Sequence, residues 1–150
     1  MRIFETIAEL QPLVGQDIAT SDWITVTQER IQLFADATND HQWIHLDAER
    51  AKAGPFKATI AHGYLTLSLL PELSASAFEV RGTRMGVNYG LNKVRFPAPV
   101  PSGSRLRGHF KLLAYEPLDG GAQLTFQVTM EREGSDKPVC VAESLARRYA

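Results

Sequence analysis

Hydrophobic side chains recur at helical spacing in the first half of the chain. Ile31, Phe34 and Ala35 fall on one helical face, and the Thr27 hydroxyl stands where it can cap the first free amides. This pattern predicts a helix from Thr27 to about Thr38.

A second apolar run, from Gly63 to Phe78, covers most of a helix circumference. It carries the leucines Leu65, Leu67, Leu69, Leu70 and Leu73. A helix that is apolar on nearly every side is enclosed by other elements, so this run predicts a long, buried central helix.

Between the two helices, residues 39–57 mix polar side chains, histidines and a Gly-Pro pair, which is typical of an irregular or briefly helical loop.

After Arg81 the pattern changes to extended segments separated by Gly, Pro, Ser and Asp. Four strands are predicted: Met85 to Phe96, Arg105 to Tyr115, Gln123 to Glu131 and Pro138 to Tyr149. In the third, Leu124, Phe126, Val128 and Met130 alternate with polar residues, as in an antiparallel strand with one buried face. Helices followed by strands indicate an α+β fold, with one antiparallel sheet packed on the apolar helix. No linker or repeat divides the chain, so we expect a single domain over 1–150.

The composition limits the classes of partner that we expect the protein to bind. Sixteen basic and seventeen acidic residues leave a net charge of −1, which provides no strong field to recruit nucleic acid or anionic lipid. No apolar run approaches the ~20 residues of a membrane helix, and the first residues lack the features of a signal peptide. We therefore expect a cytoplasmic protein without nucleic-acid or membrane partners.

Cys140 is the only cysteine, which excludes an internal disulfide, and its valine neighbours predict a buried strand thiol.

Two carboxylates and two histidines crowd the segment 37–47, directly after the first predicted helix. Asp40 and His45 are five residues apart, and a turn leaving the helix can point both side chains into one pocket. Water is a poor nucleophile because its pKa is ~15.7, so its addition to carbon needs a base, and the adjacent carbanion needs a proton donor. A carboxylate and an imidazole can supply both roles near neutral pH. Spacing alone leaves an alternative open, in which Asp40 caps a turn and His45 is structural.

His62 and Gly63 open the predicted central helix. Free amides at a helix start offer hydrogen bonds to a developing oxyanion, and Gly63 lets an acyl group approach the backbone closely. A simple turn is the alternative interpretation of this His-Gly pair.

The run from Phe34 to Asp47, followed by Ile60-Ala61-His62-Gly63, resembles the hydratase motif of the MaoC-like dehydratases, which include (R)-specific enoyl-CoA hydratases. In that family an Asp, a His five residues later and a Gly at a helix start form the motif, and Asp40, His45 and Gly63 stand at these positions. Residues 89–100 are similar to the strand and turn that follow the helix, so the similarity spans nearly the whole domain. Gln42-Trp43 replaces the usual Asn-Pro, a variant that looks like the nodulation protein N branch and puts substrate identity in doubt.

This resemblance implies a hot-dog fold, in which an antiparallel sheet wraps a long helix, and a homodimer whose sheets join edge to edge. It implies that Asp40 and His45 hold a water that adds to C3 of a trans-2-enoyl thioester while C2 receives a proton. The Gly63 amide would bind the thioester oxygen. The expected substrate is an acyl-CoA thioester, and no separate cofactor is implied.

Further residues are weaker candidates for the site. Trp43, His62, Asn92 and Arg95 are candidate substrate-pocket residues, and Lys93 with Asn92 and Arg95 would contact coenzyme A phosphates, although core or sheet-surface roles lead for each. Asp36, His41 and Asp47 are interpreted as surface, loop and cap residues. The histidine and aspartate spacing matches no closed zinc pattern, so we expect no metal.

Two other functions share the expected pocket. A hot-dog acyl-CoA thioesterase would direct water at the thioester carbon and release free thiol. A non-catalytic acyl-CoA-binding protein, suggested only by the Gln42-Trp43 variant, would bind the thioester without turnover.

Overall fold

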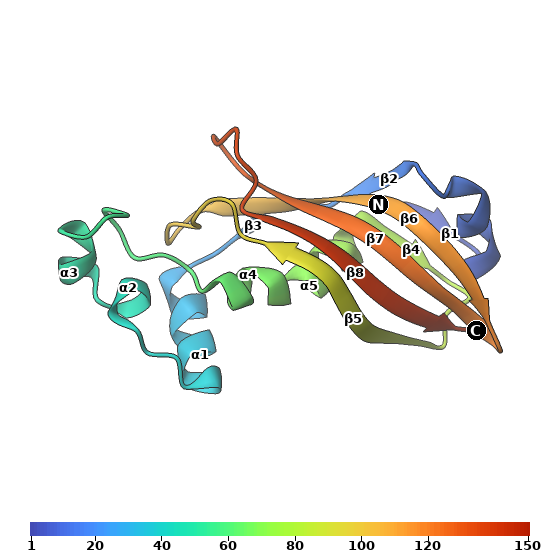
Figure 1. Ribbon diagram of the computed structural model, residues 1–150, viewed down its shortest axis with the longest axis horizontal. Coiled ribbons are helices and arrows are strands. Elements are labelled where there is room, and N and C mark those ends of the chain that lie inside the picture. Colours follow the sequence, from blue (N-terminus) through green and yellow to red (C-terminus); the bar gives the residue numbers. More distant parts are fainter.

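A six-stranded antiparallel sheet curves along two consecutive helices in the computed structural model, which describes all 150 residues (Figure 1). The sheet consists of β2 (Asp17–Thr20), β3 (Ile24–Thr25), β5 (Met85–Arg95), β6 (Arg105–Leu118), β7 (Gly121–Arg132) and β8 (Cys140–Tyr149), in the order β2-β6-β7-β8-β5, with β3 also paired to β6. The other elements are the 3-10 helix η1 (Ile7–Leu13), α1 (Gln28–Thr38), α2 (Trp43–Leu46), α3 (Ala48–Lys52), α4 (Gly63–Ser68), α5 (Leu70–Ala77) and a parallel pair of strands, β1 (Arg2–Phe4) and β4 (Phe78–Val80). No helix is long and apolar enough to cross a membrane.

The core lies between the sheet and the helices α4 and α5. Leu124, Val128 and Met130 on the inner face of β7 have no exposed surface, and Leu73 of α5 is equally buried. The predicted alternation of β7 is therefore confirmed, because successive strand residues point to opposite faces of a sheet. Cys140 also lies in this core, where burial raises the pKa of its thiol to about 11.

Helix α1 begins and ends as its sequence predicts. The Thr27 hydroxyl accepts a hydrogen bond from the Arg30 N–H at 3.1 Å, which satisfies one of the free amides of the first turn. Asn39 adopts a left-handed conformation (φ 59°) after the last turn, and the Asp40 N–H returns to the Ala35 carbonyl at 3.2 Å. This cap turns the chain sharply and brings Asp40 close to the helix end.

The central helix differs from the single helix predicted over Gly63–Phe78. It is divided at Leu69 into α4 and α5, and Phe78 already belongs to β4. Pro71 explains the division, because it has no N–H for a bond to the Leu67 carbonyl and its ring crowds that group. The helices also bury only one side, since Leu67 and Leu70 are half-buried.

The N-terminal strands and β4 were not predicted. They are two to four residues long, too short to show an alternating pattern, and they form only because β6 or a distant segment supplies partners. The four predicted strands are confirmed with shifted ends: β6 and β7 extend to an Asp119-Gly120 hairpin turn, and β8 begins at Cys140 rather than Pro138.

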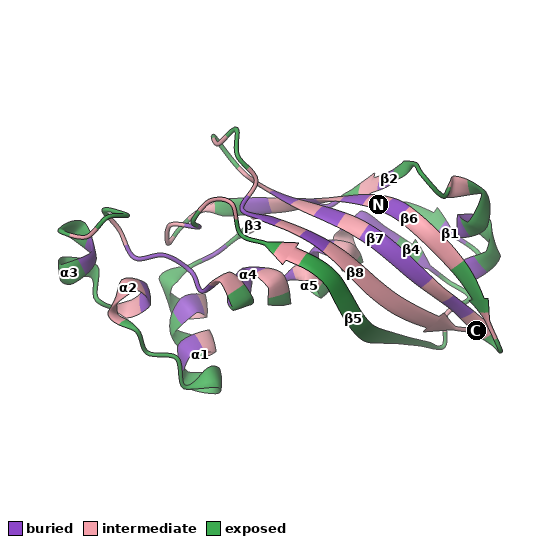
Figure 2. Ribbon diagram, in the orientation of Figure 1, coloured by how far each residue is buried: buried purple, intermediate pink, exposed green.

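Strand β5 forms an open edge of the sheet. Its only partner is β8, and ten of its eleven residues are exposed; the strand is almost entirely green in Figure 2. The exposed residues include Met85, Val87, Tyr89 and Leu91. A long edge strand with apolar side chains is a template for pairing with another chain.

Candidate active site

The short helix α2 holds His45 in a network of hydrogen bonds that spans three segments. The His45 carbonyl accepts from the Gln28 side chain at 2.8 Å, and the Thr59 hydroxyl donates to the same Gln28 side chain at 2.7 Å. The Ile60 N–H donates to the Ile44 carbonyl at 3.0 Å. A four-residue helix is too short to be stable alone, so these tertiary bonds position it.

The tautomer of His45 is set by its environment. Its side chain is buried, and Nδ1 donates to the Ile60 carbonyl at 2.7 Å, since a carbonyl can only accept. In the neutral ring, Nε2 therefore carries the lone pair. Burial lowers the pKa of His45 below its ordinary value of 6.5, which favours this neutral form. His45 thus presents a proton acceptor near neutral pH.

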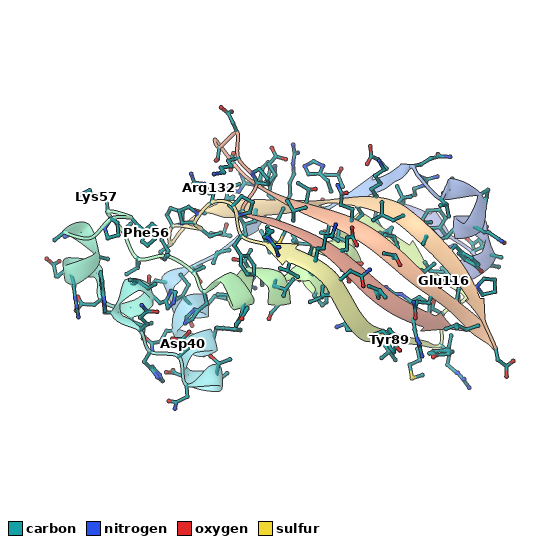
Figure 3. All side chains as sticks on the ribbon, viewed as in Figure 1. Asp40, Phe56, Lys57, Tyr89, Glu116 and Arg132 are labelled. Atoms are coloured by element: carbon teal, nitrogen blue, oxygen red, sulfur yellow. The ribbon has the colours of Figure 1, made fainter.

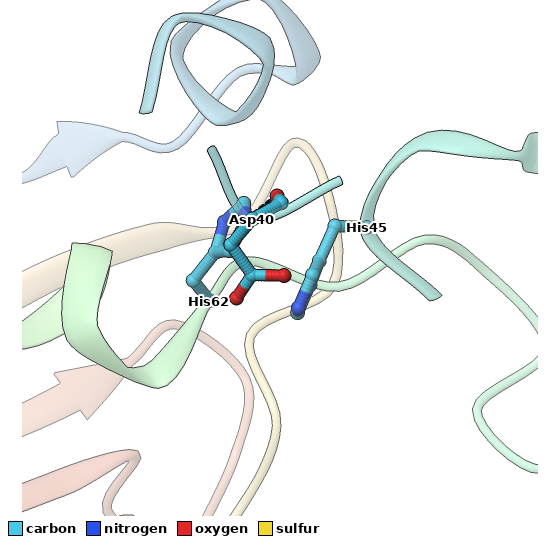
Figure 4. Close-up of side chains that lie close together, drawn as sticks. All are labelled: Asp40, His45 and His62. Atoms are coloured by element: carbon cyan, nitrogen blue, oxygen red, sulfur yellow. Dashed lines mark hydrogen bonds between the residues drawn. The ribbon is translucent and has the colours of Figure 1, made fainter. Parts of the chain in front are cut away.

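His62 links His45 to Asp40. Its Nε2 donates to the Asp40 main-chain carbonyl at 3.0 Å, the dashed line in Figure 4. Its ring stacks on that of His45, with centroids 3.8 Å apart and planes inclined by 22°. The side chains of Asp40, His45 and His62 each place one polar atom within 4.8 Å of the others. A single water molecule can bridge groups at this separation. Asp40, His45 and His62 therefore form one cluster of polar side chains.

A cavity of about 440 Å³ adjoins this cluster and is lined by both His45 and Gly63. The Gly63 N–H lies in the first turn of α4, where the helix offers it no carbonyl, and it has no acceptor within the chain. A side chain at position 63 would approach the Phe96 ring to about 3.0 Å. Glycine thus permits the close packing of Phe96 and leaves the amide accessible beside His45.

The three clustered side chains do not fit a zinc site. Zinc binds its ligands in a tetrahedral arrangement, with nitrogen atoms about 2.1 Å from the ion. The rings of His45 and His62 are stacked with planes inclined by only 22°, so their in-plane lone pairs lie in nearly parallel planes that do not meet close to both rings. The donor atoms are also partly used, because His45 Nδ1 and His62 Nε2 both donate to main-chain carbonyls.

Of the predicted site residues only His45 and Gly63 line this cavity; Asp40 and His62 lie outside its lining, and so do Trp43, Asn92 and Arg95. Trp43 packs against Gly54 and lies under the Arg50 guanidinium, 4.3 Å from the ring centroid. Asn92 and Arg95 are exposed on β5, where Asn92 contacts Glu143 and Arg95 bonds to the neighbouring Val94 carbonyl. The single chain does not bring these residues to Asp40. Figure 3 also shows Tyr89 of β5 far from Asp40.

The surface, loop and cap interpretations agree with the contacts of Asp36, His41 and Asp47. Asp36 and His41 form an exposed pair at 3.0 Å, and this hydrogen bond lowers the pKa of the Asp36 carboxyl. Asp47 caps α3 by accepting from the Arg50 N–H at 3.0 Å. None of these side chains joins the cluster of Asp40, His45 and His62.

Sequence reasoning missed Gln28 and Thr59. Both hold the backbone of the site rather than contact the cavity around Gly63. No motif marks them, since a glutamine in a first helical turn and a threonine in a loop are ordinary residues. Only the burial of Thr59, at 6% exposure, indicates that its hydroxyl requires a partner.

Comparisons with known proteins agree with this geometry. The family described as MaoC like domain matches residues 9–134. The chain is 56% identical to 3-hydroxyacyl-thioester dehydratase Z of Mycobacterium tuberculosis, over the full length of both proteins. It is 47% identical to nodulation protein N of Rhizobium leguminosarum bv. viciae, over 91% of this chain and 87% of the relative.

A solved structure supports the same assignment. The unliganded (R)-hydratase of Pseudomonas aeruginosa superposes with a TM-score of 0.74 at 26% identity, covering 97% of this chain and 86% of that protein. The sheet wrapped along α4 and α5 is the common architecture. The chain therefore belongs to the MaoC-like dehydratases, a family of hydro-lyases with the hot-dog fold.

Proposed function

We propose that the protein is an (R)-specific enoyl-CoA hydratase, which reversibly adds water to a trans-2-enoyl-CoA to give the (R)-3-hydroxyacyl-CoA. The observation that carries the proposal is the placement of polar atoms of Asp40 and of the neutral His45 ring within 4.8 Å of each other, with His45 also lining the cavity that contains Gly63. The relatives named for thioester dehydration and for (R)-hydration support the reaction class and its stereochemistry.

In the proposed reaction, Asp40 and His45 Nε2 both accept hydrogen bonds from one water molecule. The water oxygen forms a bond to C3 of the enoyl group as one of its protons passes to the pair. The electrons of the C2–C3 double bond move toward the thioester, and the pair returns a proton to C2. No net proton is gained or lost, so the pair suits both directions of the reaction.

The thioester oxygen gains negative charge as C3 is attacked. We assign the Gly63 N–H to this oxygen, because it is a preorganised donor in the cavity that contains His45. Removing one such donor typically lowers a rate by ~10²–10³. Because the proposed chemistry uses only these protein groups and water, it requires no separate cofactor or metal.

The reaction class can be tested with purified protein and crotonyl-CoA. Loss of the enone absorbance, together with chromatographic identification of (R)-3-hydroxybutyryl-CoA, would support hydration. Release of free coenzyme A without a hydroxyacyl product would instead identify a thioesterase. Tight binding of the thioester without any product would identify an acyl-CoA-binding protein.

The acid side of the pH profile should report His45. Because burial lowers the pKa of this imidazole, the neutral ring persists to a lower pH than that of a solvent-exposed histidine. We expect kcat/KM for hydration to fall, as pH decreases, with an apparent pKa below the ordinary value of 6.5. Steady-state kinetics over the range in which circular dichroism is unchanged would measure it. An acid limb at or above that ordinary value would contradict a buried, neutral His45.

We also propose a homodimer formed by antiparallel pairing of β5 with β5 of a second copy. The free edge and its exposed apolar residues support this arrangement, as do the half-buried leucines Leu67 and Leu70 beside β5. Light scattering should give a dimer mass.

Val87→Lys should weaken the dimer more than tenfold, because the two-fold symmetry of the pairing places a new lysine of each subunit near the other's. Leu33→Lys, at an exposed position on α1, is the control and should leave the dimer unchanged.

A further inference from the structure

Several segments of the candidate site meet at the side chain of His62. The residue is only 3% exposed and directly precedes Gly63, the first residue of α4. Its ring contacts two other aromatic rings: that of Phe34 in α1, with centroids 4.9 Å apart, and that of His45 in α2, which stacks on it at 3.8 Å. Figure 4 shows His62 beside Asp40 and His45. One buried imidazole therefore joins α1, α2 and the start of α4.

The His62 side chain makes its single hydrogen bond to the main chain of Asp40. Its Nε2 lies 3.0 Å from the Asp40 carbonyl oxygen, which can only accept, so Nε2 carries the proton. The other ring nitrogen, Nδ1, is buried and has no partner. The bond spans 22 residues of the chain. It holds the backbone of the residue whose carboxylate belongs to the cluster.

The other hydrogen bonds of Asp40 are local. Its N–H donates to the Ala35 carbonyl at 3.2 Å, and its Oδ1 accepts from the Gln42 N–H at 3.4 Å. Both partners lie within five residues of Asp40, so neither bond fixes this loop relative to α4. The bond from His62 supplies that connection between segments.

Packing alone does not explain a histidine at position 62. A buried nitrogen without a partner costs free energy, so a phenylalanine ring would fill the same space at a lower cost. Asp40 is an exposed residue, so water can reach its carbonyl if the donor on His62 is lost. The donor therefore contributes more to the placement of Asp40 than to the stability of the fold.

We propose that His62 is a positioning residue, which holds the Asp40 carboxylate and the His45 ring in register with each other and with the Gly63 amide. Its hydrogen bond fixes Asp40, its ring sets the plane of the His45 ring, and its main chain continues into Gly63. It lies outside the lining of the cavity, so it acts through these neighbours. The expected effect on rate rests on the proposed hydration reaction, whereas the placement of Asp40 does not.

Two substitutions separate the hydrogen bond from the packing. His62→Phe keeps a flat ring against His45 but removes the donor, whereas His62→Gln keeps an N–H donor of similar reach. We expect His62→Phe to lower kcat for crotonyl-CoA about tenfold to a hundredfold, with KM within about twofold of wild type, since misplacing a catalytic group by about 1 Å can cost about 10² in rate. His62→Gln should recover most of this loss. The midpoint temperature of His62→Phe should stay within about 4 °C of wild type.

His109→Phe is the matched control for this substitution. His109 lies on β6, where it is half-exposed and contacts Glu131 at 2.7 Å, and it is not in the cluster. Its kcat should remain at the wild-type value. Equal losses of kcat in His62→Phe and His62→Gln would assign the effect to packing and would overturn the inference, as would a His62→Phe variant that keeps the wild-type rate.

The route through Asp40 is tested in the Asp40→Asn background. There His62→Phe should lower kcat by less than about threefold, because residues that act as a unit have non-additive effects. A loss by the same factor in both backgrounds would mean that His62 acts independently of the carboxylate, contrary to the inference.

Hydrogen exchange at the Asp40 amide tests the placement without any turnover. This N–H is bonded to the Ala35 carbonyl, so its exchange reports the opening of the turn that follows α1. His62→Phe should accelerate the exchange about fivefold, the factor that corresponds to one typical hydrogen bond, and His62→Gln should remain near wild type. Unchanged exchange in His62→Phe would overturn the inference. Failure of the wild-type protein to hydrate crotonyl-CoA would overturn the proposed function alone, because the exchange result still decides whether His62 holds Asp40.

Discussion

His45→Gln is expected to lower kcat for crotonyl-CoA hydration by about 10²–10⁴, the usual contribution of a positioned acid or base. Glutamine has a polar side chain of similar reach, yet its amide cannot take up the proton that the attacking water releases. The His45 ring also has a single available nitrogen, because Nδ1 is committed to the Ile60 carbonyl. Stopped-flow or steady-state loss of enone absorbance would measure the effect.

Asp40→Asn is expected to lower kcat by a similar factor, since it removes the charge that orients and activates the water but keeps the size of the side chain. His41→Gln is the matched control: His41 lies in the same loop, is exposed and pairs with Asp36 rather than with the cluster. Its kcat should remain near that of wild type. Near-normal rates for both Asp40→Asn and His45→Gln, with circular dichroism unchanged, would refute the acid/base assignment.

Leu124→Ala is expected to destabilise the fold by about 2–5 kcal/mol, the usual cost of truncating a fully buried leucine. Leu124 has no exposed surface and lies on β7, which is paired on both sides by β6 and β8. The surrounding strands hold one another in place, so the space left by the removed atoms cannot easily close. For a chain of this length the midpoint temperature should fall by roughly 4–20 °C, as measured by calorimetry or thermal circular dichroism.

Thr129→Ala serves as the control for this change, because Thr129 lies on the same strand but on the half-exposed outer face. Its cost should stay below about 1 kcal/mol, the full span of strand propensities. If Leu124→Ala were no more destabilising than Thr129→Ala, the inner face of β7 would not be the core.

Local sequence patterns were sufficient for the elements with strong periodicity. The spacing of Ile31 and Ala35 and the hydroxyl of Thr27 define α1 through interactions within a few residues. The alternation from Leu124 to Met130 defines the buried face of β7, because side chains on a strand must point to opposite sides. Both patterns act locally, so no knowledge of distant contacts was required.

Short elements depended on partners far away in the chain. Strand β2 pairs with β6, about ninety residues later, and its four residues carry no pattern of their own. Pro71 divided a helix that hydrophobic spacing alone predicted to be continuous. In that case a local rule was present in the sequence, because the proline lacks the N–H that a continuous helix needs.

The candidate site likewise combines features that the sequence shows with features that only the tertiary structure decides. The motif with Asp40, His45 and Gly63 was visible in the sequence because its residues occur at characteristic intervals, and the resemblance to a known family added their roles. The tautomer of His45 and its stacking on His62 depend on the Ile60 carbonyl and on ring placement across different segments. Sequence alone therefore determined which groups are available for chemistry, while tertiary packing decided their orientation, burial and partners, because those properties arise only when distant segments meet.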